Sequence, residues 1–309
     1  MSRYEIHPQP PTGDADASIL VRDAASASTA AAQLWWSHPP PLPGEIVGAI
    51  GGFTATDSTA AAAVLDAATA RLAQAGCTIA IGPMDGNTWR THRFVIESDG
   101  RGPFLLEPRN PAPFPDWWRA AGFSELSRYS SSIMPLDGKS TVTPALTSRL
   151  ENAGVVLRPL DPSRYDDELR AIHAVSLASF SSNFLYTPLE ESAFLDSYRK
   201  VREHVDPAFV RIAEKNGVPC GFVFGIPDLE AAARGETPAL IVKTLAVDPA
   251  SRCAGLGSLL VDAIHLSAWQ KGYREAIHAL QYENNRSLKI TGRHHGHPFR
   301  RYALFHKKP

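Results

Sequence analysis

The sequence predicts an α/β protein (α+β in detail) built from two lobes, and three patterns along the chain support this. In residues 154–309, apolar strand-like runs alternate with helical segments in the order β-α-α-β-β-β-α-β-α-β. The first half carries a weaker form of the same alternation. Between the halves, residues 135–144 combine proline, glycine, serine and threonine, as linkers do. The predicted division is a mobile N-terminus (1–17), a first lobe (18–134), a linker (135–153) and a second lobe (154–309).

Local signals predict each element of the second lobe. The Asn216-Gly217 dipeptide favours a hairpin turn between two strands. Apolar residues recur at helical spacing after Gly255, and Gly272 stands at the expected end of that helix. In order, we expect a strand at 155–160, helices at 163–179 and 189–204, strands at 209–214, 219–225 and 239–247, a helix at 255–271, a strand at 275–281, a helix at 284–291 and a strand at 300–306.

The first lobe is predicted from similar but weaker patterns. An alanine-rich helix over 58–74 is expected to begin at Asp57 or Ser58, since both side chains can cap a helix N-terminus. The other predicted elements are strands at 45–50, 77–81 and 128–133 and a short helix near 115–122.

Composition excludes several classes of protein. The 309 residues are 44% hydrophobic and 20% charged, which is typical of a globular fold. A net charge of −1 offers no basic field for nucleic acid, and no apolar run reaches the roughly 18 residues that span a membrane. The N-terminus lacks a basic-then-apolar signal sequence. We therefore expect a cytoplasmic monomer or homodimer whose three cysteines remain reduced.

One segment carries the strongest functional signal. A strand ends at Val247-Asp-Pro249, a loop of the form Arg252-x-x-Gly255-x-Gly257 follows without an acidic residue, and a helix then begins. The glycines let a ligand approach the backbone, and the helix adds free N–H groups and the positive end of its dipole. Together these features predict a receptor for a phosphate or pyrophosphate. An ordinary strand-to-helix turn is the alternative, whereas Rossmann and Walker loops match the spacing less well.

This loop resembles the acyl-CoA-binding motif of the GCN5-related N-acetyltransferase (GNAT) superfamily, and the element order of residues 154–309 resembles the whole fold. The resemblance implies transfer of an acetyl group from acetyl-CoA to a primary amine of a small molecule or peptide. Asn284 and Ser287 match the family's Asn-x-x-Ala/Ser element beside the cofactor. The implied cofactor-binding residues are Leu245, Ala246, Val247, Arg252, Cys253, Ala254, Gly255, Leu256, Gly257, Ser258, Asn284 and Ser287.

The proton chemistry departs from the family pattern. The usual acid is a tyrosine seven residues after Asn284, where this chain has Thr291. Tyr302 and Tyr282 are nearby alternatives, while Glu283 and His278 are candidate bases. His278 could instead be a hydrogen-bonded strand residue, and Glu283 could simply cap a helix. Aminolysis of the thioester through water would need no dedicated acid.

The first half resembles a degenerate GNAT lobe, which implies a tandem of two lobes, each with a mixed, mostly antiparallel sheet flanked by helices. Residues 54–59 occupy the place of the phosphate loop but have neither arginine nor Gly-x-Gly, and Asp57 would repel a pyrophosphate. We therefore expect only the second lobe to bind acetyl-CoA. A non-catalytic CoA-binding sensor or scaffold is the alternative function.

The acceptor is expected between the second lobe and the polar, aromatic insertion at 82–93 of the first lobe. The candidate acceptor-binding residues are Asn183, Phe184, Tyr186 and Trp89. These aromatic residues could alternatively only fasten loops to the core. No metal site is expected, because His294, His295 and His297 lack a cysteine or carboxylate at ligand spacing.

Overall fold

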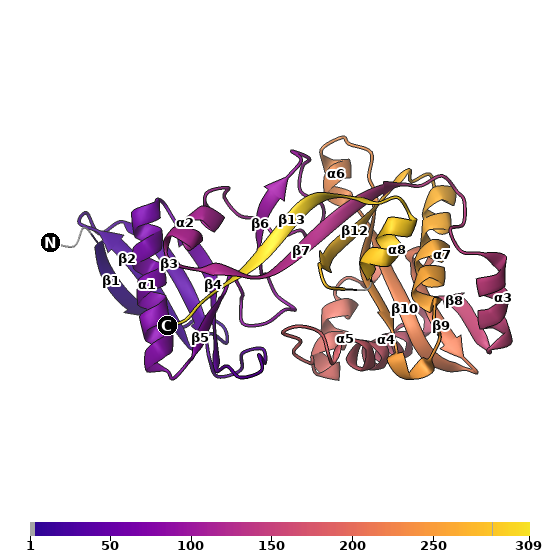
Figure 1. The fold of residues 1–309 in the computed structure, drawn as a ribbon, viewed down its shortest axis with the longest axis horizontal. Coiled ribbons are helices and arrows are strands. Elements are labelled where there is room, and N and C mark those ends of the chain that lie inside the picture. Colours follow the sequence, from indigo (N-terminus) through magenta and orange to yellow (C-terminus); the bar gives the residue numbers. More distant parts are fainter. Residues whose placement is uncertain (1–3, 286) are drawn as a thin grey trace.

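The computed structural model describes residues 4–285 and 287–309. Its strands form one 13-stranded mixed sheet, ordered β1-β2-β3-β4-β5-β13-β7-β12-β11-β10-β9-β8, with β6 paired to β13. Helices flank the sheet, so the architecture is the predicted mixed α/β class. Figure 1 shows two groups of elements joined by a pair of long strands, β7 (Ser124–Pro135) and β13 (His297–Lys307).

The first lobe is built around α1 (Ser58–Gln74), which has the predicted bounds. The Asp57 side chain caps it by accepting from the backbone N–H groups of Thr59 and Ala60, both at 2.9 Å. The remaining elements are β1 (Tyr4–Gln9), β2 (Ala17–Asp23), β3 (Ser28–Trp35), β4 (Val47–Ala55), β5 (Ile79–Gly82), β6 (Phe94–Ser98) and α2 (Phe114–Ala120).

The N-terminus differs from the expectation of a mobile segment over 1–17. Residues 4–9 form β1 and pair antiparallel with β2. Tyr4 is 8% exposed in the first core, and its hydroxyl donates to Asp57 at 3.1 Å. The sequence did not predict this strand for two reasons. The segment is rich in proline, and a single buried side chain, Tyr4, gives no period-2 pattern.

The second lobe contains the predicted elements in the predicted order, with one additional short helix, α6, between the strands predicted at 219–225 and 239–247. They are β8 (Val155–Pro159), α4 (Tyr165–Phe180), α5 (Glu191–Arg199), β9 (Val210–Lys215), β10 (Val218–Pro227), α6 (Leu229–Ala233), β11 (Leu240–Val247), α7 (Leu256–Gln270), β12 (Glu275–Tyr282) and α8 (Ser287–Arg293). The segment expected as a linker, 135–153, holds a further helix, α3 (Pro144–Asn152), capped by Thr143. Its Leu150 is buried in the core of the second lobe, which explains why this stretch is ordered.

The two lobes share their central strands. β7 directly follows the first lobe in sequence, yet it pairs with β12 from Glu275–Pro135 to Tyr282–Tyr129. β13 pairs with β7 along its length, and its last residues, 305–307, pair with β5 of the first lobe. The predicted boundary at residue 135 therefore falls at the end of a strand that already belongs to the sheet of the second lobe.

Candidate active site

The loop between β11 and α7 is shaped to receive an anion. Arg252 and Gly255 have left-handed backbone conformations, with φ of 53° and 88°, and turn the chain into α7. α7 has no side-chain cap and no acidic residue in its first turn. Among the described residues, the N–H groups of Ala254 and Gly255 have no acceptor. Free N–H donors and the positive end of a helix dipole favour an anion at such a position.

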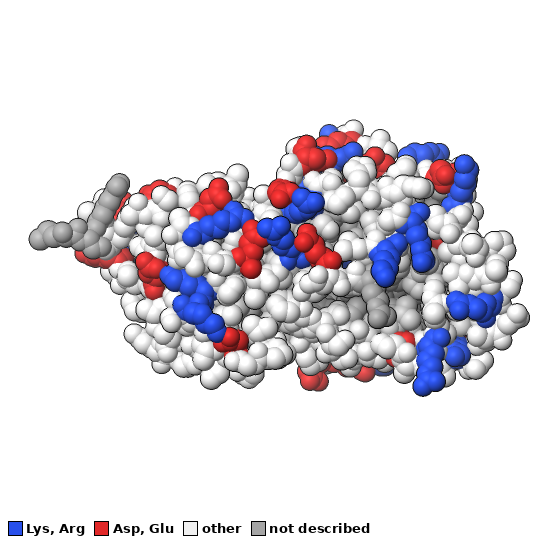
Figure 2. All heavy atoms as spheres, in the orientation of Figure 1, with Lys and Arg blue, Asp and Glu red and all other residues white. Residues whose placement is uncertain are grey.

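Basic side chains surround this loop. Arg293 of α8 donates to the Ser258 hydroxyl at 2.8 Å, and Lys215 donates to the carbonyl of Ser251 at 3.0 Å. Arg149 of α3 donates to the carbonyl of Ala254. Figure 2 shows Lys and Arg side chains over the α7 and α8 side of the second lobe, with few acidic ones beside them. The local field therefore favours a polyanionic ligand.

Beside this loop, strands β11 and β12 separate. Their parallel pairing covers only Leu240–Ala276, Ile241–Ile277 and Val242–His278. At this point Lys243 is the extra residue of a bulge, because Val242 pairs with Gly225 and Thr244 with Phe224. We call the diverging region, residues 243–247 of β11 and 279–282 of β12, the splay.

A left-handed residue marks the β12 side of the splay. Leu280 has φ of 54°, and the pairing of β12 with β7 shifts between His278 and Gln281. On the other side, a Cβ atom at Gly257 would lie 3.5 Å from the Leu245 side chain. The glycine loop and the diverging strand therefore meet, which brings the predicted residues Leu245, Val247 and Gly257 together.

Comparison with known proteins agrees with this geometry. Residues 170–296 match the family model of the acetyltransferase (GNAT) family. The chain carries a GNAT domain. Solved structures with the same fold include a GNAT protein from Sphaerobacter thermophilus (TM-score 0.56, 12% identity, 94% of this chain and 80% of that one). Another is a tandem GNAT protein from the clavulanic acid biosynthesis pathway (TM-score 0.50, 14% identity, 99% of this chain and 83% of that one).

Two curated relatives match this chain over only part of their own length. The bacterial ceramide synthase of Caulobacter vibrioides is 26% identical over 69% of this chain and 56% of its own length. Protein YghO of Escherichia coli is 24% identical over 55% of this chain and 44% of its own. The chain thus spans about half the length of the curated relatives it matches.

The candidate proton-transfer residues of the GNAT domain lie apart. Glu283 follows β12, is partly exposed and lies 4.0 Å from Arg301 Nε. Tyr302 is fully buried in β13, where its hydroxyl shares a hydrogen bond with Ser131 at 2.9 Å and donates to Glu107. Burial and the neighbouring Glu107 carboxylate raise the pKa of Tyr302. The third candidate, His278, is held in a separate buried chain.

That chain connects Thr291 with three imidazoles. The Thr291 hydroxyl donates to Gln281 Oε1 at 2.8 Å and lies 2.8 Å from His278 Nδ1. His278 Nε2 is 3.2 Å from His265 Nε2, and His265 Nδ1 is 3.3 Å from His294 Nδ1. Burial and the neighbouring His294 lower the pKa of His278 to about 3, so this imidazole is neutral at physiological pH. In the described part of the chain, no three His, Cys, Asp or Glu side chains are arranged to hold a metal ion.

Of the remaining predicted cofactor residues, Ser287 begins α8 and Asn284 lies in the turn before it. Ser287 Oγ accepts from the Gln281 side chain at 3.0 Å, and the Asn284 amide donates to the Tyr282 hydroxyl at 3.2 Å. Cys253 is buried, and its thiol donates to the carbonyl of Ser251 at 3.4 Å, which suits a supporting role in the loop.

The predicted acceptor residues come together where the lobes meet. Trp89 of the first lobe donates from Nε1 to the carbonyl of Thr187 at 2.7 Å, and its ring lies 6.3 Å from that of Tyr186. Phe184 stacks on Tyr282 of the splay at 5.7 Å. Asn183 is exposed beside them.

No helix of the described residues is long and apolar enough to cross a bilayer.

Sequence reasoning missed two cations beside the splay, Arg93 and Lys243. The signal for Lys243 was present, because it is the single charge inside the apolar run of β11. Arg93 gave no comparable signal, since it ends a polar loop with several other basic residues.

Proposed function

We propose that the protein is an N-acetyltransferase that uses acetyl-CoA as acyl donor and a primary amine as acceptor. The observation that carries the proposal is the approach of the uncapped start of α7 to the diverging strand β11, at Gly257 and Leu245. The loop from Arg252 to Ser258 would hold the pyrophosphate through backbone N–H groups. Backbone N–H groups near Leu245 and Val247 would polarise the thioester carbonyl.

One side chain and solvent are assigned to the proton steps. Acyl transfer forms a C–N bond and breaks the C–S bond, and the ammonium nitrogen of the acceptor loses two protons. One of them ends on the leaving sulfur, and the other must be removed before the nitrogen attacks. We assign the uptake of that proton to Glu283, because it stands at the end of the splay and is partly open to solvent. Thr291 is not assigned as the acid, since its hydroxyl is committed to Gln281 and His278. Solvent would protonate the leaving thiolate.

A longer acyl chain is the second candidate donor. The observation behind it is the similarity to a protein named bacterial ceramide synthase, because a ceramide contains an amide bond. The same assay with palmitoyl-CoA in place of acetyl-CoA separates the two donors. We further propose that the protein is cytoplasmic, acts as a monomer or homodimer and binds acetyl-CoA only in its second lobe.

The decisive experiment measures release of free thiol from acetyl-CoA with a panel of primary amines. Glu283→Gln should lower kcat roughly 100-fold or more at neutral pH and leave acetyl-CoA affinity unchanged. Glu97→Gln is a matched control, because Glu97 pairs with the same Arg301 at 2.7 Å. Binding of acetyl-CoA without thiol release from any donor and amine would support the sensor or scaffold alternative instead.

A further inference from the structure

Two cations face each other across the junction of the lobes. Lys243 is the bulged residue of β11 and is exposed to solvent, while Arg93 is the last residue of the insertion of the first lobe and is partly exposed. Lys243 directly follows Val242, which pairs with His278 of β12. Arg93 donates to the carbonyl of Leu280, two residues after His278. The register of β11 and β12 therefore places both positive groups at the start of the splay, and the charge of Arg93 accordingly contributes to lowering the pKa of Lys243.

No acidic side chain neutralises this pair. Among residues 4–285 and 287–309, no ion pair includes Arg93 or Lys243. The Arg93 guanidinium instead donates to the Leu280 carbonyl at 3.2 Å and to the His92 ring, and it lies 3.9 Å from the centre of the Tyr129 ring. Its Nε is buried with no hydrogen-bond partner in the described structure. A buried guanidinium N–H group normally has a hydrogen-bond acceptor, so the Arg93 side chain retains an unused donor at this site.

The backbone around the pair is held in place at some cost. Arg93 has φ of 69°, which is unfavourable for a residue other than glycine, and Leu280 has φ of 54°. The N–H of Leu280 donates to Ser131 Oγ at 2.9 Å, and Ser131 is hydrogen-bonded to Tyr302. Strained conformations of this kind persist where the surroundings fix them, which is common at ligand-binding sites.

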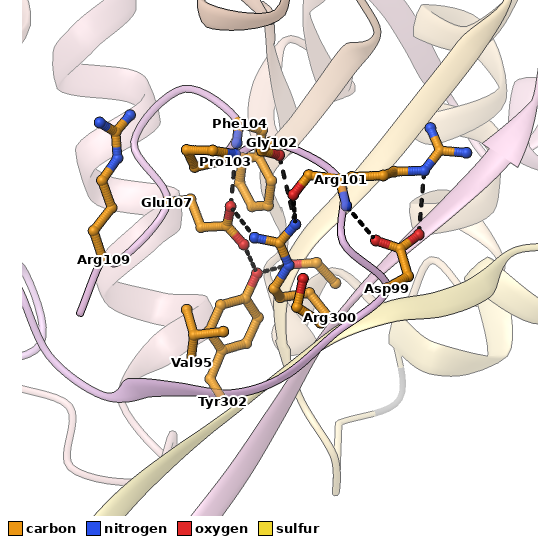
Figure 3. Close-up of polar contacts among 12 residues, drawn as sticks. Val95, Asp99, Arg101, Gly102, Pro103, Phe104, Glu107, Arg109, Arg300 and Tyr302 are labelled. Atoms are coloured by element: carbon orange, nitrogen blue, oxygen red, sulfur yellow. Dashed lines mark hydrogen bonds and ion pairs between the residues drawn. The ribbon is translucent and has the colours of Figure 1, made fainter. Parts of the chain in front are cut away.

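Figure 3 shows what anchors this chain of contacts. Tyr302, Glu107 and Arg300 converge beneath the loop that contains Gly102 and Phe104, and Arg300 donates to the Arg101 carbonyl at 2.7 Å. Glu107 and Arg300 are buried and paired at 3.1 Å. Glu107 and Arg300 neutralise each other, so the Glu107 carboxylate is not available to Arg93 or Lys243.

We propose that Arg93 and Lys243 form a subsite for a carboxylate carried by one of the two reactants. This inference rests on the proposed acyl transfer at the splay, and it specifies the substrate class. The carboxylate would belong either to the acceptor, as in an amino acid, or to the acyl group, as in a dicarboxylic acyl-CoA. Arg93 supplies planar, rigidly held donors and Lys243 supplies a mobile charge that can follow the ligand.

The electrostatics of the pair agree with this assignment. Part of Lys243 reaches solvent, but the protein packed around its ammonium group, and then the charge of Arg93, lower the pKa of Lys243. Burial lowers the pKa of Arg93 to about 10. Both effects disfavour the charged forms in the absence of an anion. A bound carboxylate would oppose them and raise the pKa of Lys243.

The first test needs no turnover. Acetate and the neutral acetamide are titrated into the full chain, and the pKa of Lys243 is followed by NMR of its ¹³Cε. Acetate should raise the pKa of Lys243 and acetamide should not, while the exposed Lys139 of the linker should respond to neither. Arg93→Gln should weaken the effect of acetate; if this variant does not fold, the acetate–acetamide contrast in the wild type still decides. Equal responses to acetate and acetamide would overturn the subsite.

The second test identifies which reactant carries the carboxylate. Calorimetry compares succinyl-CoA with butyryl-CoA, and thiol-release kinetics with acetyl-CoA compare L-phenylalanine with L-phenylalaninamide. The carboxylate form should be preferred roughly tenfold in one of these comparisons, and Lys243→Met should abolish that preference, whereas Lys139→Met should retain it. A preference that survives Lys243→Met would overturn the assignment. An acetate response without any turnover would support the subsite and refute the proposed enzyme.

Discussion

Arg93 of the first lobe donates a hydrogen bond from Nη1 to the carbonyl oxygen of Leu280 in the second lobe, at 3.2 Å. Both residues have positive φ, so the contact joins two strained points 187 residues apart in sequence. Because Leu280 marks the place where β12 leaves β11, the first lobe directly supports the shape of the splay. The N-terminal half of the chain therefore contributes to the candidate active site.

The glycine loop gives a test of cofactor binding. Gly257→Asp should weaken acetyl-CoA binding at least about tenfold more than Gly257→Asn, which has nearly the same shape and no charge. A Cβ at this position would meet Ile290 at 3.3 Å, so both variants need the same small adjustment. Calorimetry measures the two dissociation constants. Equal affinity of the two variants would show that the pyrophosphate does not lie at this helix start.

The threonine in the family's tyrosine position should matter for stability more than for rate. Thr291→Val removes the hydroxyl but keeps the shape, and it leaves His278 Nδ1 without its partner. We expect a loss of about 1–3 kcal/mol in the free energy of unfolding and a change in kcat of less than about tenfold. Denaturant titration and thiol-release kinetics measure these quantities, and Thr291→Ser should restore most of the stability. A hundredfold loss of kcat would instead make Thr291 a participant in proton transfer.

The buried imidazoles predict acid lability. Burial lowers the pKa of both His92 and His278 from the usual 6.5 to about 3, with a smaller effect from Arg93 on His92 and from His294 on His278. The unfolded chain therefore binds more protons than the native chain between these values, and stability must fall as pH decreases from about 6.5 toward 3. Each such histidine contributes a slope of about 1.4 kcal/mol per pH unit.

Unfolding free energies measured across this pH range check the prediction. His278→Gln should reduce the slope, and His204→Gln, at an exposed position of the second lobe, should not. A wild-type stability that stays flat from neutral pH to pH 4 would contradict it.

The Arg300–Glu107 pair predicts an asymmetric mutational response. Their side chains are 5% and 0% exposed, so Arg300→Met leaves an unpaired carboxylate and should cost about 3–5 kcal/mol of stability. Adding Glu107→Leu removes that carboxylate and should recover most of the loss. Chemical denaturation of the single and double variants measures both effects. A double variant no more stable than Arg300→Met would mean that the pair is not the main source of the cost.

Trp89 tests the acceptor side. Trp89→Ala should raise the KM for the amine at least about fivefold while leaving acetyl-CoA affinity unchanged, because the ring contacts Tyr186 and not the glycine loop. Trp89→Phe keeps a ring but loses the hydrogen bond to Thr187, so its KM for the amine should lie between those of the wild type and Trp89→Ala. If instead both substrates bind more weakly and the melting temperature drops, the ring serves only to fasten the 180–188 loop.

The sequence was informative where structure is local. α1 and its Asp57 cap, and the turn into α7, follow from short-range signals, so these elements could be predicted. β1 was missed because its one buried side chain, Tyr4, leaves no periodic pattern. The partner of each central strand could not be predicted either, since β7 would fit the sheet of either lobe on local pattern alone.

The candidate site likewise has one part that could be predicted from the sequence and another that could not. Residues 252–258 could be assigned from the sequence because they are contiguous and carry their own backbone requirements. Arg93 and Lys243 are 150 positions apart, and only the fold places them together. Tyr302 and His278 were reasonable candidates by position, but only the structure shows that their polar atoms are already engaged.

The sharing of β7 and β13 by the two lobes has a consequence for how this protein folds during synthesis. The first lobe needs residues 305–307 to complete its sheet at β5, so this sheet can close only after β13 has been synthesised. The edge of β5 stays unpaired until then, and the two halves should unfold as one unit rather than in sequence. Attempts to express either half alone should yield insoluble material unless the missing strand is supplied in trans.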